Sequence, residues 1–87
     1  MLVVTEIAWN GGIRRLAVDT SRRSDASRWE DLVSRVPAQP PPYRVVPGAA
    51  VYHVGIDSHV LLVSENDLAG PLRDLVVAVL TAGTGQG

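Results

Sequence analysis

Two alternating segments joined by Asn10-Gly11-Gly12 open the sequence, and this arrangement strongly favours a β-hairpin. Residues 2–9 and 13–20 each place successive side chains on opposite sides, as strands do. Two registers of this hairpin are possible. If Asn10-Gly11 is the turn, Ile7 pairs with Arg14 and Val3 with Val18. If Gly11-Gly12 is the turn, Ile7 pairs with Leu16. These registers differ by two positions, which preserves sidedness, so both predict the same apolar face.

Residues 24–36 have the apolar spacing of an amphipathic helix. The stripe at positions i, i+3, i+4 and i+7 consists of Trp29, Leu32, Val33 and Val36. Two N-terminal caps are possible, either Ser24 or a capping box of Ser27 with Glu30. We expect Pro37 to end the helix, because the residue before a proline is disfavoured in helical conformation.

A second hairpin is predicted from residues 49–56 and 59–65, with Asp57-Ser58 as the turn. In this register Leu61 lies opposite Val54 and Val63 lies opposite Tyr52. The connector that precedes it, residues 37–48, contains three consecutive prolines and therefore reads as extended polyproline or loop. It could be a ligand for a proline-reading domain, but we favour a stiff crossover between the first helix and the second hairpin.

Gly70-Pro71 is expected to open a second helix, since proline suits the first helical position. The apolar stripe of this helix consists of Leu72, Leu75, Val76, Val79 and Leu80. Gly83 is expected to end it, which leaves residues 83–87 as a flexible tail, frayed from Thr84.

The order of these elements is β-β-α-β-β-α, which predicts an α+β fold. With 87 residues the chain can form little more than one sheet layer and one helix layer. We therefore expect a single domain over residues 1–87, with a four-stranded, mainly antiparallel sheet and both helices packed on one face of it.

The charge pattern is balanced, with a formal net charge of −1 and no lysine. Five of the eight arginines fall in one short stretch, namely Arg14, Arg15, Arg22, Arg23 and Arg28. A nucleic-acid patch is one interpretation. We favour a solvated surface neutralised by nearby acids (Asp19, Asp25, Glu30 and Asp31), because phosphate binding normally needs a net basic face.

Composition also bears on location. Cysteine is absent, so the sequence offers no disulfide or thiolate metal site. The first residues lack the basic region and cleavage site of a signal peptide, and no apolar run reaches the roughly 18 residues of a membrane helix. The expectation is a cytoplasmic protein that has neither a membrane nor a nucleic acid as its partner.

The two histidines are the first candidates for a metal site or an acid–base pair, together with Asp57. In the predicted second hairpin His53 lies on the side of Leu62, whereas His59 lies on the side of Val54 and Leu61. Because these sides are opposite faces of the sheet, we expect two rim histidines rather than metal ligands, and no metal or cofactor.

Other catalytic patterns are also missing from the sequence. Ser58 and Ser64 lack a G-x-S-x-G setting, and no P-loop, G-x-G-x-x-G or H-E-x-x-H motif occurs. One sheet with two helices also encloses a pocket of about 300 Å³ or more only with difficulty. We therefore do not expect an enzyme.

Binding features are better represented, above all at the tip of the first hairpin. The candidate protein-binding residues are Trp9, Asn10, Gly11, Gly12, Ile13 and Arg14. Tryptophan and arginine dominate the energetics of interfaces, and a glycine turn holds them in a fixed place. The alternative, which one sequence does not exclude, is that Trp9 packs over the end of the core.

Several short motifs are spread over the chain from Leu2 to Leu80. They are Gly11, Gly12 and Arg14 at the first tip, Asp19-Thr20 after it, Tyr52, Val54 and Ile56 in the second hairpin, LLVSENDL at 61–68, and Leu72, Leu75 and Val76 in the last helix. Together they resemble the emfourin family, bacterial protein inhibitors of thermolysin-type zinc metallopeptidases such as protealysin.

The resemblance implies a protein that binds a thermolysin-like metallopeptidase and occludes its active-site cleft. We expect the protein itself to be a monomer or weak homodimer. The hairpin tip is our candidate for the contact; Met1-Leu2 and the turn Asp57-Ser58 are rivals, and an exposed His59 could reach the protease zinc. The alternative function is a non-catalytic interaction or dimerisation module, which would use Val51, Val60 and Leu62 on the sheet face opposite the core.

Overall fold

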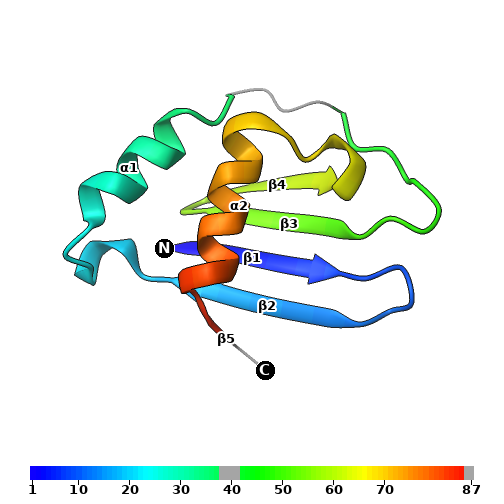
Figure 1. Cartoon of the computed structure of the whole chain (residues 1–87), viewed down its shortest axis with the longest axis horizontal. Coiled ribbons are helices and arrows are strands. Elements are labelled where there is room, and N and C mark those ends of the chain that lie inside the picture. The colour runs from blue at the N-terminus through cyan, green and yellow to red at the C-terminus, as the bar shows by residue number, and fades with distance from the viewer. Residues whose placement is uncertain (38–41, 86–87) are drawn as a thin grey trace.

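The computed structural model describes residues 1–37 and 42–85, and these form an antiparallel sheet with the strand order β4-β3-β1-β2-β5 and two packed α-helices (Figure 1). The strands are β1 Leu2–Ile7, β2 Ile13–Val18, β3 Val51–Ile56, β4 His59–Ser64 and β5 Thr84–Gly85. The helices are α1 Ala26–Ser34 and α2 Gly70–Ala82, with 3₁₀ turns η1 Thr20–Arg22 and η2 Glu65–Asp67. The predicted α+β fold with its order β-β-α-β-β-α is confirmed, and β5 adds a short fifth strand.

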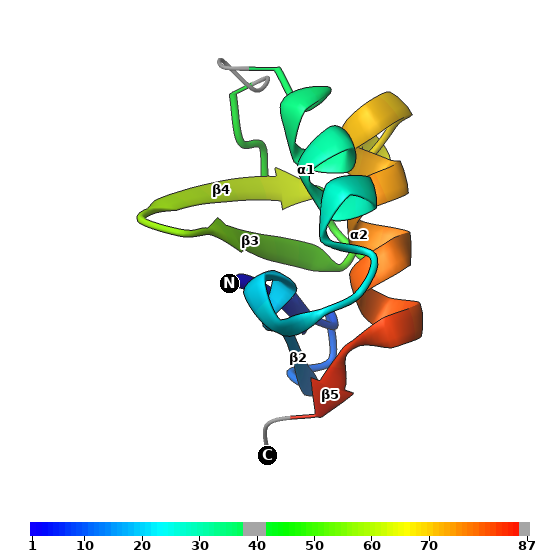
Figure 2. The ribbon, with the colours of Figure 1, turned by 90° about the vertical axis from the view of Figure 1, so that its left-hand side faces the viewer.

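A single apolar layer between the sheet and the helices forms the core. Its members from the sheet are Leu2, Val4, Val18, Tyr52, Val54 and Val63, and those from the helices are Trp29, Leu72, Leu75, Val76 and Val79. Figure 2 shows both helices on the same side of the sheet. The opposite side, called the outer face below, carries Val3, Thr5, Ile7, Ile13, Arg15, Val51, His53, Val60 and Leu62.

The register of the first hairpin differs from both predicted alternatives. Leu2 pairs with Val18 and Ile7 with Ile13, so the chain turns over residues 8–12 rather than through a two-residue turn. The shift from either prediction is an odd number of positions, which exchanges the two faces of β1. The pairing predicted for Val3 was therefore wrong, and Leu2 rather than Val3 lies on the core side with Val18.

Burial explains why the longer loop is preferred. It places Val4 opposite Leu16 on the core side, where Val4 is fully buried. Gly11 provides the positive φ that the loop needs, at +92°. The Asn10-Gly11-Gly12 run predicts a turn correctly but is compatible with more than one loop length.

The second hairpin has the predicted register, with Tyr52 opposite Val63 and Val54 opposite Leu61. The turn is formed by Asp57-Ser58, and Asp57 takes the left-handed conformation with φ +53°. Asparagine and aspartate tolerate this conformation better than most residues. A two-residue loop leaves the register no freedom, which is why the sequence determines it.

The first helix lies within the predicted range but is capped differently. It begins after Asp25, and no side-chain hydrogen bond caps it, so neither the Ser24 cap nor the Ser27–Glu30 box forms. The Asp25 carboxylate instead accepts a 2.9 Å hydrogen bond from Nε of Arg23. Of the predicted stripe, Trp29 is buried in the core, and Leu32, Val33 and Val36 pack against it.

The second helix ends at Gly83 as predicted, for a reason the sequence does not reveal. Gly83 has φ −71°, which any residue can adopt. A Cβ at this position, however, would lie 2.6 Å from the carbonyl oxygen of Val79 and 3.0 Å from Cβ of Leu16. Glycine thus allows the chain to pass closely over β2.

The tail was predicted to be frayed from Thr84, and the structure places its first two residues against β2. Thr84 pairs with Ala17 and Gly85 with Leu16, so that β5 covers part of the β2 edge of the sheet. Residues 86–87 lie outside the described residues.

The connector is only partly described, because residues 38–41 lie outside the described part of the chain. Residues 42–46 have no regular secondary structure. Arg44 within it forms an ion pair of 2.8 Å with Asp67 of η2.

None of the described helices is both long and apolar enough to cross a membrane.

Candidate protein-binding site at the hairpin tip

The hairpin tip, residues 9–14, is held by hydrogen bonds within the loop. The N–H of Ala8 donates to the carbonyl of Gly12 at 2.7 Å, and the N–H of Gly11 donates to the carbonyl of Ala8 at 2.9 Å. The side chain of Asn10 accepts from the N–H of Gly12 at 3.0 Å. The tip is thus a closed, ordered loop.

Two large apolar side chains project from this tip. Trp9 is 58% exposed and Ile13 is 70% exposed. The sequence left open whether Trp9 covers the core, and the structure places most of its surface in solvent. Trp9 lies in the loop and Ile13 is the first residue of β2, so an exposed aromatic and an exposed aliphatic side chain flank the glycines, and protein interfaces use apolar anchors of this kind.

Arg14, the third candidate contact, is tied to the base of the hairpin. Its Nη2 lies 3.4 Å from Oε1 of Glu6, the residue directly opposite on β1. Oε2 of Glu6 in turn accepts a 2.7 Å hydrogen bond from the hydroxyl of Tyr52 on β3. The three residues link β2, β1 and β3 below the tip.

This arrangement changes the acidity of the phenol. Burial, and after it the hydrogen bond to the Glu6 carboxylate, raises the pKa of Tyr52 to about 12. The phenol, protonated at neutral pH like any tyrosine, thus keeps its proton to higher pH than usual and acts as the donor. Sequence reasoning missed Glu6 and Tyr52 as supports of the tip. The opposite charges of Glu6 and Arg14 could have indicated that these residues pair, but they face each other only in the register that the structure has.

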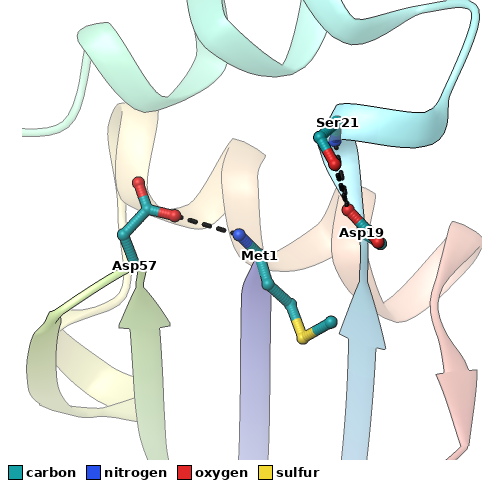
Figure 3. Close-up of polar contacts among 4 residues, drawn as sticks. All are labelled: Met1, Asp19, Ser21 and Asp57. Atoms are coloured by element: carbon teal, nitrogen blue, oxygen red, sulfur yellow. Dashed lines mark hydrogen bonds and ion pairs between the residues drawn. The ribbon is translucent and has the colours of Figure 1, made fainter.

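The two rival contact segments lie together, away from the tip. The ammonium nitrogen of Met1 is 2.9 Å from Oδ1 of Asp57 (Figure 3). The backbone N–H of Asp57 also donates to the carbonyl of Met1. Leu2 is buried in the core and has no surface to offer a partner. These segments lie where β1 begins, whereas the tip lies where β1 ends.

The arginine cluster does not form a single basic face among the residues whose side chains are described. Arg14 lies on the helix side of the sheet, and Arg15 lies on the outer face. Arg23 pairs with Asp25 and lies over the ring of Trp29 at 5.6 Å. This ion pair lowers the pKa of Asp25.

Next to this cluster, the side chain of Asp19 caps the N-terminus of η1. Its Oδ1 accepts hydrogen bonds from the N–H and the hydroxyl of Ser21, at 3.2 and 2.7 Å (Figure 3). Asp19 and Asp25 thus supply negative charge within the same stretch as the arginines.

The histidines lie on opposite sides of the sheet, as predicted from the second hairpin. His53 pairs with Leu62 on the outer face, whereas His59 pairs with Ile56 on the helix side. Among residues 1–37 and 42–85 there is no group of three or more His, Cys, Asp or Glu side chains that could hold a metal ion.

A hollow of about 530 Å³ lies between α1 and α2, larger than we expected such a fold to form. Its polar lining consists of Arg23, Asp25, Arg28, Arg73, Asp74 and Thr81. The hydroxyl of Thr81 donates to the carbonyl of Val77 at 2.8 Å, within its own helix. The lining includes no histidine, serine or cysteine that could serve as base or nucleophile.

No protein-family model matches the chain, and neither a curated protein nor a solved structure shows detectable similarity to it. The emfourin resemblance thus rests on the residues quoted for it and stays a prediction.

Proposed function

We propose that this protein is a non-catalytic protein-binding domain that inhibits a thermolysin-like zinc metallopeptidase by placing the hairpin tip in the active-site cleft. The observation that carries the proposal is the exposure of Trp9 and Ile13, at 58% and 70%, on a closed loop. The resemblance to emfourins supplies the class of target.

The physical basis is the low cost of docking an ordered loop. A flexible loop loses conformational entropy when it binds, whereas a loop fixed by its own hydrogen bonds has already lost most of it. Apolar surface removed from water contributes roughly 25 cal/mol per Å². Trp9 and Ile13 supply such surface, and the strands around them supply the remainder of an interface of about 1,600 Å².

The same loop is a poor substrate. A protease cleaves a segment that it holds in an extended conformation, and the loop hydrogen bonds of Ala8, Gly11 and Gly12 oppose that conformation. The tip can thus occupy the cleft without being cut. This resistance to cleavage separates an inhibitor from a substrate that merely competes.

The experiment is a titration of a thermolysin-like metallopeptidase with the purified protein, monitored by hydrolysis of a small peptide substrate. We expect activity to fall progressively with added protein. Mass spectrometry after the incubation should then show the chain uncut. Full activity at micromolar excess, or rapid cleavage of the chain at residues 8–13, would reject the proposal.

The outer face supports a second candidate function, weak self-association. No described helix covers this face, and Val60 on it is 69% exposed. Arg15 lies opposite Thr5 near its centre, so a symmetric pair would bring two arginines near each other. We therefore expect at most a weak dimer, and sedimentation showing a monomer up to millimolar concentration would exclude this function.

A further inference from the structure

One edge of the sheet is partly covered, because a two-residue strand pairs with Leu16 and Ala17 of β2, whereas the other edge is a full six-residue strand. β5 pairs with β2 at the first edge, whereas β4 is the terminal strand at the second. Among the described residues, no backbone group forms a hydrogen bond with the edge of β4 that points away from β3. Exposed edge strands are usually protected by lysine, proline or inward charges, and β4 with the sequence HVLLVS has none of these.

The hydrogen-bond pattern identifies the open backbone groups. The N–H of Glu65 donates to the carbonyl of Ala50, which makes these two a hydrogen-bonded pair of the β3–β4 ladder. Pairs alternate along an antiparallel ladder, so Leu61 and Val63 also bond toward β3. The N–H and C=O groups of Val60 and Leu62 therefore point away from the sheet.

An apolar groove accompanies this edge on the helix side. It has a volume of about 280 Å³ and is lined by Val33, Val36, Pro37, Ile56, His59 and Leu61. Val33 belongs to α1, and Val36 and Pro37 follow that helix, while Leu61 belongs to β4 itself. A strand added to β4 would direct every second side chain toward this groove.

We propose that the β4 edge binds an extended peptide segment of a partner protein by strand addition, with an aliphatic side chain of that segment in the groove. Main-chain hydrogen bonds from Val60 and Leu62 would supply general affinity, and the groove would supply selectivity. This surface is separate from the hairpin tip and does not depend on the inhibitor function.

A second copy of the chain fits the edge less well than a free segment. Pairing of β4 with β4 of another copy would keep the helix sides together, so the side chains nearest the groove would be those of Leu61 and Val63. Val63 is 2% exposed, and Leu61 packs against the same core. Side chains committed to their own core cannot fill the groove of a neighbour, whereas those of a free segment can.

The test uses ¹⁵N-labelled protein and an acetylated, amidated peptide that alternates threonine with valine or leucine. The control peptide has the same composition with its aliphatic residues consecutive. We expect amide hydrogen exchange at Val60 and Leu62 to slow at least tenfold with the alternating peptide. Leu61 and Val63, which already bond to β3, should be protected from exchange before any peptide is added, and this checks the assigned hydrogen-bond pattern.

Substitutions separate the groove from other apolar surface. Val36→Glu should weaken peptide binding at least tenfold, because it places a charge in the groove. Val77→Glu is the matched control, since Val77 is 50% exposed on α2 and lies outside the groove; it should leave binding unchanged. If Val36→Glu does not fold, the exposed rim substitution His59→Glu takes its place.

Three results would overturn the proposal. The first is no slowing of exchange at Val60 and Leu62 up to millimolar peptide. The second is peptide-induced shifts confined to the outer face or the hairpin tip. The third is slowing at Val60 and Leu62 that rises with protein concentration without peptide, which would show that a second copy occupies the edge.

Discussion

The hydroxyl of Tyr52 donates a 2.7 Å hydrogen bond to the carboxylate of Glu6, across the β1–β3 pair and directly below the hairpin tip. Because Glu6 also pairs with Arg14, the base of the hairpin is fixed on three strands. The exposed tip thus stands on a polar network at the end of an otherwise apolar core.

We predict that the phenol of Tyr52 loses its proton at a higher pH than an ordinary tyrosine does. Its pKa is raised to about 12 in the folded state against 10.0 for an ordinary tyrosine. A folded-state pKa above the unfolded value stabilises the protein below pH 10, and this contribution disappears as the pH rises through 12. The corresponding loss in the free energy of unfolding is at most about 3 kcal/mol.

Phenolate absorbance in a Tyr43→Phe variant, in which Tyr52 is the remaining tyrosine, measures this directly. Glu6→Gln removes the nearby negative charge and should move the Tyr52 pKa back toward the ordinary value. An inflection near pH 10 in the folded Tyr43→Phe protein would contradict the assigned contact.

Gly83→Ala should lower the free energy of unfolding by about 1–3 kcal/mol, because the added methyl group has no room between Val79 and Leu16. Gly55→Ala is the matched control in β3, where a Cβ would lie 3.6 Å from the nearest atom, a carbonyl oxygen of Val3. It should change stability by less than about 0.5 kcal/mol. Chemical denaturation compares the two, and equal losses would mean that β5 does not approach β2 as described.

Asp57 should tolerate asparagine but not a branched residue. Its φ of +53° costs a β-branched side chain about 1–2 kcal/mol, so Asp57→Val should be destabilising by that amount. Asp57→Asn loses only the ion pair to the Met1 ammonium, whose two sides are 54% and 80% exposed. Such exposed pairs contribute about 0–1 kcal/mol. Equal melting temperatures of the Asp57→Asn and Asp57→Val variants would argue against a left-handed conformation at Asp57.

The two hairpins show what limits prediction of the fold from sequence. Asp57-Ser58 leaves room for one register, and the predicted pairs of β3 and β4 are those in the structure. Asn10-Gly11-Gly12 accommodates several loops, and burial of Val4 against Leu16 decides between them. Pairing of Thr84 and Gly85 with β2 was out of reach, because it depends on how closely Gly83 lets the chain approach.

The candidate site was predicted in part. The tip and its residues are recognisable from the glycines and the neighbouring Trp9, but the exposure of Trp9 depends on the loop that the core selects. The role of Arg14 changes most, since its pairing with Glu6 makes it a support of the hairpin as much as a contact. The open β4 edge follows only from the strand order, which the sequence does not specify.

The inhibition constant of Trp9→Ala, compared with that of Val60→Ala, tests the central proposal most directly. Both side chains are well exposed, at 58% and 69%, so neither substitution should disturb folding, but only Trp9 belongs to the tip. We predict at least a tenfold rise for Trp9→Ala, equivalent to about 1.4 kcal/mol, and no change for Val60→Ala. Equal inhibition by both variants and the unsubstituted protein would contradict insertion of the tip into the cleft.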